Sequence, residues 1–85
     1  RGWGALVRTL SFEERDGYPF QFRTSEPIVG ATIHDAATGE TLGVTDANGF
    51  AVITAEMPPA RIEARYGGVT KSCRMGEARA ATLGF

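Results

Sequence analysis

Two residues in this sequence belong to the types that most often serve as nucleophile or general base, the single His34 and the single Cys73. A catalytic triad needs a nucleophile, a base and an orienting acid that converge. The sequence has no nucleophile elbow and no partner acid at a diagnostic spacing. Alternation with Ala31 and Ile33 places His34 on the solvent side of a predicted strand. We therefore expect a surface or partly covered histidine and no enzymatic activity in the chain itself.

The same inventory argues against a metal site. A structural zinc site takes four Cys or His ligands, and the chain offers two in total. The segment Asp46-Ala47-Asn48-Gly49 resembles part of a calcium loop, but it lacks a third oxygen ligand before the glycine and a closing glutamate. We expect a turn stabilised by the Asp46 side chain instead, and neither a metal nor another cofactor.

Two further clusters have the residue types of a binding site but not the pattern. Glu13, Glu14 and Asp16 are interrupted by Arg15, which favours a solvated polar turn over residues 13–17. Gly2 and Gly4 precede a predicted strand, whereas a phosphate cradle needs a glycine-rich loop that leads into a helix. Neither cluster predicts a ligand.

The aromatic residues allow two interpretations. Tyr18, Phe20 and Phe22 alternate with polar residues, so they share one face of a strand and could stack on a sugar or a base. In a small sandwich such a face is more often part of the core. Trp3, which lies between two glycines, is the better candidate for an exposed anchor or for a contact with a neighbouring domain. The sequence leaves the partner-binding residues unassigned.

Length and composition limit the elements that could position any site. The 85 residues suffice for one compact domain, residues 1–85. The net charge of -1 gives no general electrostatic attraction for nucleic acid or anionic lipid. No run approaches the roughly 18 apolar residues of a membrane helix. Because the chain begins with Arg1 and not with Met, we expect a domain excised from a longer protein.

Short β-favouring runs separated by glycines predict an all-β fold, a small antiparallel β-sandwich of seven or eight strands. The predicted strands span residues 5–12, 18–23, 31–35, 41–45, 50–55, 62–66, 69–75 and 80–85. Lys71 is the one charged residue on the apolar side of its run, so we expect it near an end of its sheet. Residues 76–81 could hold one helical turn at most.

Glycine-containing turns at residues 37–40, 46–49 and 67–68 can each supply the positive φ of a tight hairpin. They predict three successive hairpins, a meander from residue 31 to residue 75. Pro58-Pro59 interrupts this meander, and we expect the chain to cross between the two sheets there.

The order of these pieces resembles the C-terminal periplasmic domain of an outer-membrane usher, the assembly platform of the chaperone-usher pilus pathway. The resemblance covers residues 4–75 and rests on the segments Gly4 to Arg8, Gly17 to Phe22, Pro27 to Ala31, Gly43-Val44, Gly49, Ile62 to Gly67 and Ser72-Cys73-Arg74. It implies a non-catalytic periplasmic domain that binds chaperone-subunit complexes during pilus assembly and secretion. Its other partners would be neighbouring domains of the same chain, and it would meet the membrane only through a covalently attached barrel.

A second resemblance remains open. Residues 27–33, 38–46 and 48–50 are also similar to the transthyretin-like or carboxypeptidase-regulatory β-sandwich. That family implies an accessory module that stabilises or orients an attached enzyme, or one that binds carbohydrate. A third possibility is a structural spacer in a surface or secretion protein, with no partner beyond its covalent neighbours.

Overall fold

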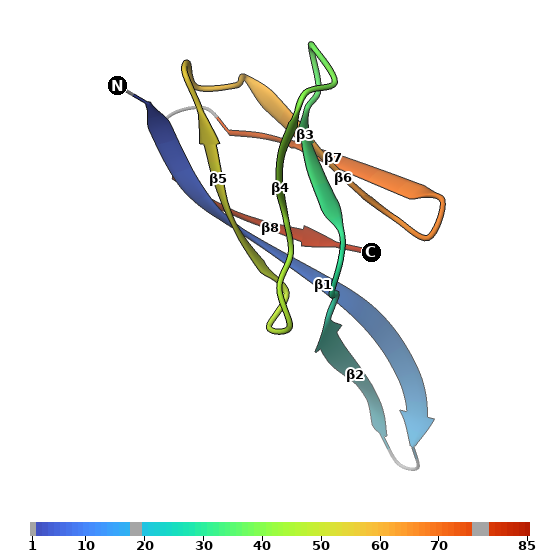
Figure 1. Ribbon diagram of the computed structural model, residues 1–85. Coiled ribbons are helices and arrows are strands. Elements are labelled where there is room, and N and C mark those ends of the chain that lie inside the picture. The colour runs from blue at the N-terminus through green and yellow to red at the C-terminus, as the bar shows by residue number, and fades with distance from the viewer. Residues whose placement is uncertain (1, 18–19, 76–78) are drawn as a thin grey trace.

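The chain forms eight strands in two sheets that pack face to face as a small β-sandwich (Figure 1). The structure is a computed structural model. It describes residues 2–17, 20–75 and 79–85, and of residues 13–17 and 20–24 it describes the backbone. The predicted all-β class and sandwich architecture are confirmed.

The first sheet, here called sheet A, is organised by one long strand. β1 (Trp3–Gly17) pairs with β5 (Phe50–Ala55) through its first half and with β2 (Phe20–Pro27) through its second half. β8 (Ala80–Gly84) lies along the other edge of β1, where Leu6 faces Ala80 and Leu10 faces Gly84. The β1–β8 pair is parallel, whereas the other pairs of the sandwich are antiparallel.

The second sheet, sheet B, has the order β4-β3-β6-β7. Its strands are β3 (Thr32–Asp35), β4 (Thr41–Val44), β6 (Arg61–Tyr66) and β7 (Val69–Arg74). Within the residues that the structure describes, β7 pairs only with β6 and forms an edge of the sheet. Lys71 lies on this edge strand and is exposed, as its place on the apolar side of the run predicted.

The core lies between the sheets and follows from alternation along the strands. Val7 and Ile53 from sheet A and Ile33 and Ile62 from sheet B are fully buried. Burying a side chain of this size contributes about 1.5–3 kcal/mol relative to leaving it in water. The other members of this contiguous buried cluster are Trp3, Ala5, Leu42, Ala51, Ala64, Met75 and Leu83. At the margin the rings of Tyr66 and Phe85 meet edge to face, 6.5 Å apart, and link the two sheets.

Two of the three predicted hairpins are present. The turn between β3 and β4 has Gly39 at φ 80°, and the turn between β6 and β7 has Gly67 and Gly68 at φ 58° and 79°. Left-handed φ values of this kind are accessible to glycine without steric cost. The crossing at Pro58-Pro59 is also confirmed, because it connects β5 in sheet A to β6 in sheet B.

The prediction of a third hairpin at residues 46–49 is wrong. This turn joins β4 in sheet B to β5 in sheet A, so the meander breaks there. A Cβ on Gly43 would lie only 3.2 Å from Cγ2 of Ile53. The bare backbone of Gly43 therefore lets β5 pack its inward face closely against β4, while the edge of β5 pairs with β1.

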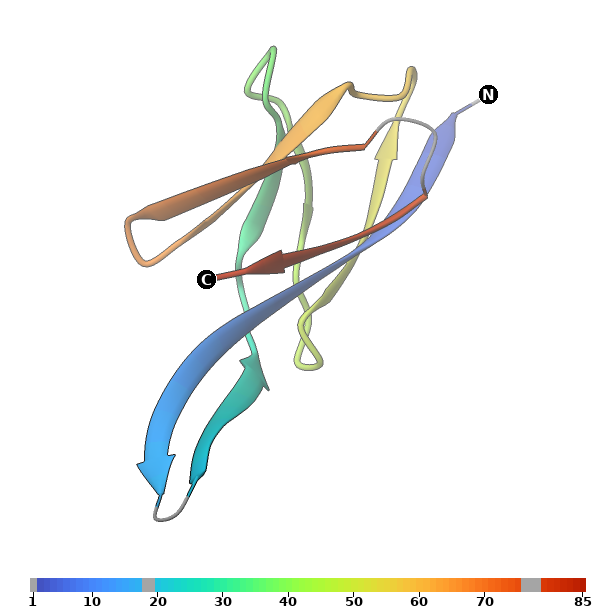
Figure 2. The ribbon, with the colours of Figure 1, turned by 180° about the vertical axis from the view of Figure 1, so that it is seen from behind.

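The prediction of a polar turn at residues 13–17 is also wrong. These residues continue β1, and their backbones pair with β2 from Glu13↔Thr24 to Gly17↔Phe20. Cross-strand pairing overrides the weak β-propensity of this charged segment. The β1–β2 hairpin reaches beyond the body of the sandwich (Figures 1 and 2). The whole molecule measures 53 × 25 × 21 Å.

Two predictions fall partly outside the described residues. Tyr18 lies outside them, and the side chains of Phe20 and Phe22 are not described, so the proposed aromatic face is not tested. Of the possible helical turn at 76–81, residues 76–78 lie outside the described part, and Ala80 and Ala81 belong to β8.

Candidate partner-binding surface

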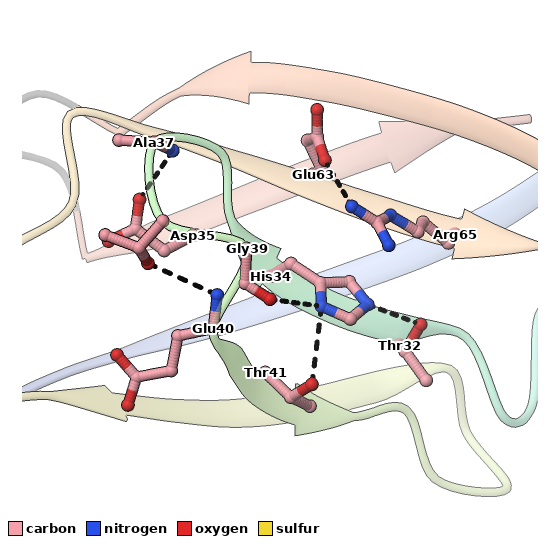
Figure 3. Close-up of polar contacts among 10 residues, drawn as sticks. Thr32, His34, Asp35, Ala37, Gly39, Glu40, Thr41, Glu63 and Arg65 are labelled. Atoms are coloured by element: carbon pink, nitrogen blue, oxygen red, sulfur yellow. Dashed lines mark hydrogen bonds and ion pairs between the residues drawn. The ribbon is translucent and has the colours of Figure 1, made fainter.

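His34 lies on the outer face of sheet B, as its alternation with Ala31 and Ile33 predicted, but it is buried there and not exposed. Its exposed fraction is 9%, because the turn between β3 and β4 folds over the ring. Nδ1 lies 3.3 Å from the Gly39 carbonyl oxygen, and Nε2 lies 2.9 Å from the Thr32 hydroxyl oxygen (Figure 3). A carbonyl only accepts, so Nδ1 donates to Gly39, while the Thr32 hydroxyl, which can donate or accept, is the partner of Nε2. Both nitrogens have structural partners, and His34 holds the hairpin together.

The Asp46 turn has the structure that its sequence predicts, except that it crosses between sheets. Oδ1 of Asp46 accepts hydrogen bonds from the backbone N–H groups of Asn48, at 2.8 Å, and Phe50, at 3.0 Å. Gly49 adopts φ 80°. The carboxylate therefore serves the backbone of the turn. Among the described residues, no three His, Cys, Asp or Glu side chains are grouped closely enough to hold a metal ion.

Cys73 is half-buried beside the core, opposite Ile62. Burial raises the pKa of its thiol above the ordinary value, and the nearby Arg61 guanidinium offsets part of that rise. Because the thiolate is the reactive form, a raised pKa makes this cysteine a poor nucleophile at neutral pH.

Sequence reasoning missed a pair of buried threonines that join the two sheets. The Thr45 hydroxyl donates to the Ile28 carbonyl oxygen at 2.7 Å and accepts from the Ala31 N–H at 2.9 Å. The Thr9 hydroxyl lies 3.2 Å from the same Ile28 oxygen. Together they hold the connection from β2 to β3. Both are almost wholly buried, and only the polar type of these residues within apolar runs could have indicated such a role.

Trp3 does not form the exposed anchor that its terminal position suggested. It is 8% exposed and belongs to the core cluster. Trp3 pairs with Ala55 of β5, and its indole packs into the core. Gly4 is therefore part of the regular strand β1, which begins at Trp3.

An acidic hollow opens at one end of the sandwich, where the β3–β4 turn meets the end of β5. Glu40, Ala55 and Glu56 line it, with Asp35 and Met57 on one side and Gly2 and Thr54 on the other. The Asp35 carboxylate already accepts a hydrogen bond from the Ala37 N–H at 2.9 Å (Figure 3). This arrangement is that of a solvated surface.

The outer face of sheet A exposes apolar side chains that are cross-strand neighbours. Leu6 and Val52 face each other across β1 and β5 and are 41% and 74% exposed. In the next row, the Arg8 guanidinium carbon lies 5.5 Å from the centre of the Phe50 ring. The residues between them, Val7, Ala51 and Ile53, point into the core. Because side chains alternate along a strand, the four residues of these two rows share the outer face. We call Leu6, Arg8, Phe50 and Val52 the Leu6 face.

The Leu6 face continues toward β8 and the β1–β2 hairpin. Phe12, which is 38% exposed, lies over Gly84, where an added Cβ would meet its ring. The glycine thus gives the ring room to lie against the sheet. Ala80 and Thr82, which pair with Leu6 and Arg8, add small exposed side chains between them.

The outer face of sheet B differs in chemistry. Its middle rows bring Thr32 beside Arg65 and His34 beside Glu63. Arg65 and Glu63 form an ion pair at 3.1 Å (Figure 3). Val44 is the exposed apolar residue of this face, at 54%. Glu63 and Arg65 neutralise each other, and Arg61 and Arg74, which face each other across β6 and β7, add two further exposed guanidinium groups to the face.

Comparison with known proteins identifies no relative. No family model matches the chain, no curated protein matches it, and no solved structure matches it. In the described part of the chain, no helix is long and apolar enough to cross a membrane.

Proposed function

We propose that this chain is a non-catalytic binding domain, the C-terminal periplasmic domain of an outer-membrane usher, which holds chaperone-subunit complexes during pilus assembly. The observation that carries the proposal is a rigid sandwich that exposes the neighbouring apolar side chains of Leu6 and Val52. Exposed apolar residues that adjoin one another are typical of protein interaction sites. Holding and releasing a protein partner needs such a surface and no reactive group.

The ordered segments behind the usher resemblance support the family. Within the entry Pro27 to Ala31, Gly30 has φ 84° and Ala31 is fully buried at the crossing from sheet A to sheet B. Gly43 allows close packing on Ile53, and Gly49 makes the second crossing. These positions restrict the residue type for steric reasons, so their order supports the resemblance although each segment alone is short.

The secretion role predicts the mode of binding. Pilus assembly would draw its energy from strand exchange between subunits, so the domain needs only moderate affinity. Contacts through apolar side chains lose little strength at high salt, because salt screens charges and not apolar burial. We therefore expect binding that tolerates salt.

The test is a binding titration of the domain with a periplasmic chaperone loaded with a pilin subunit, at low and at high salt. We expect saturable binding at both salt concentrations and no binding to an unrelated β-sandwich of similar charge. Absence of binding at either salt concentration would contradict the proposal. A glycan array serves as the control for the transthyretin-like alternative, and specific binding to a sugar would favour that function.

A further inference from the structure

We infer that the Leu6 face is the docking surface, and that it receives a protein segment that presents a carboxylate between apolar side chains. The inference rests on the proposed function and deepens it, since it assigns both the surface of this domain and the chemistry of the partner.

The two outer faces of the sandwich are not equivalent. Sheet B has a neutralised ion pair between Glu63 and Arg65 at its centre, with threonines around it. Sheet A has the adjoining exposed pair Leu6 and Val52. The centres of protein interfaces are depleted of charged residues other than Arg and enriched in apolar and aromatic side chains. The Leu6 face fits this description and the outer face of sheet B does not.

Arg8 supplies the charge that specifies the partner. Its guanidinium lies over the Phe50 ring, 5.5 Å from the centroid, and the residue is exposed. Among the residues that the structure describes, no carboxylate lies within ion-pair distance of it. The stacking fixes the planar guanidinium at little further cost in entropy, while its N–H groups remain available to a carboxylate.

A two-fold contact between two copies of this face lacks a counter-charge for Arg8. No acidic residue stands at the positions of β1, β5 and β8 that share the face, from Gly4 to Phe12, Phe50 to Thr54 and Ala80 to Gly84. A two-fold contact through the face would bring Arg8 near its own copy without a counter-charge. Because a two-fold contact between copies leaves Arg8 without a counter-charge, we assign a different protein as the partner, acidic where it meets Arg8 and apolar where it meets Leu6 and Val52.

Four variants test the assignment against the chaperone-loaded pilin. Arg8→Gln and Val52→Ser alter the Leu6 face, whereas Arg74→Gln and Val44→Ser make the same changes at exposed positions of sheet B. We expect each change on the Leu6 face to weaken binding by about tenfold, as loss of a central interface contact does. The sheet B variants should bind within about twofold of the unaltered domain, since residues outside an interface contribute little.

The outcomes separate this inference from the proposed function. If the unaltered domain binds and Arg8→Gln and Val52→Ser bind equally well, the Leu6 face is wrong while the proposed function stands. If the unaltered domain does not bind, both fail.

Circular dichroism melting of each variant shows whether it is folded. Arg8→Lys tests whether the guanidinium itself, and not only its charge, is needed for binding. Because lysine keeps the charge but not the planar stacked fork, it should recover only part of the lost affinity.

Discussion

Thr9 and Gly49 approach so closely that position 49 admits no side chain. The Thr9 N–H donates to the Gly49 carbonyl oxygen at 2.8 Å, and a Cβ on Gly49 would lie 2.7 Å from the Thr9 carbonyl oxygen. The same Cβ would lie 2.9 Å from Cβ of Pro27. At this point the end of β2, the middle of β1 and the start of β5 converge, so the crossing between the sheets depends on this glycine.

Gly49→Ala should therefore be strongly destabilising. The left-handed φ of 80° alone costs about 1–2 kcal/mol for alanine. The clash with backbone adds about 1–3 kcal/mol more, as for other overpacked sites. Gly39→Ala is the matched control, since it has the same φ with nothing within 4 Å. Urea unfolding should show a clearly larger loss for Gly49→Ala, and equal losses would refute the steric argument.

Thr45→Val tests the threonines that join the sheets. Valine keeps the shape, but it leaves the Ala31 N–H without its hydroxyl acceptor and the Ile28 carbonyl with the Thr9 hydroxyl alone. We expect the free energy of unfolding to fall by about 1–3 kcal/mol, the cost of unsatisfied buried polar groups. Thr70→Val, at an exposed position of β7, should change it by less than about 0.5 kcal/mol. Unfolding curves that coincide for the two variants would disprove the role of Thr45.

His34→Ala should loosen the β3–β4 hairpin. The change removes a buried ring and its contacts with Gly39 and Thr32. A loss of about 1–3 kcal/mol in unfolding free energy is expected from these contacts. Lys71→Ala, on the exposed edge strand, serves as the control. If His34→Ala left stability unchanged, the ring would not be the structural element described.

The raised thiol pKa of Cys73 makes stability depend on alkaline pH. The folded state holds the thiol proton more tightly than the unfolded state does, because burial disfavours the thiolate. Above the ordinary thiol pKa the unfolded state loses this proton first, so the free energy of unfolding falls as pH rises toward the folded pKa. Cys73→Ser should remove this component. Identical pH profiles of unfolding for the two proteins would contradict the assignment.

The sequence predicts the strands better than their connections, for a physical reason. Alternation reports burial along one strand, so the segments at Ile62 and Phe50 are predictable. Which edge a strand pairs with depends on contacts distant in sequence. The turn at Asp46 looks like a hairpin locally, but the close approach of Gly43 to Ile53 sends β5 to the other sheet.

The solvent exposure of individual side chains was predicted less well than the positions of the strands. His34 and Trp3 were both expected to meet solvent. The turn between β3 and β4 covers His34, and Trp3 packs into the core between the sheets. The Leu6 face could likewise not be predicted from the sequence. The run around Leu6 is apolar on both faces, so only the packing of Val7 into the core shows which side chains remain outside.

The most direct test of the central claim follows the methyl signals of Leu6, Val52 and Val44 by NMR during titration with chaperone-loaded pilin. Val44 is a suitable internal reference, because it is exposed on the opposite sheet. The account predicts that the Leu6 and Val52 methyl signals shift or broaden as the complex is added while that of Val44 stays in place. Unchanged Leu6 and Val52 signals at saturating complex would contradict it.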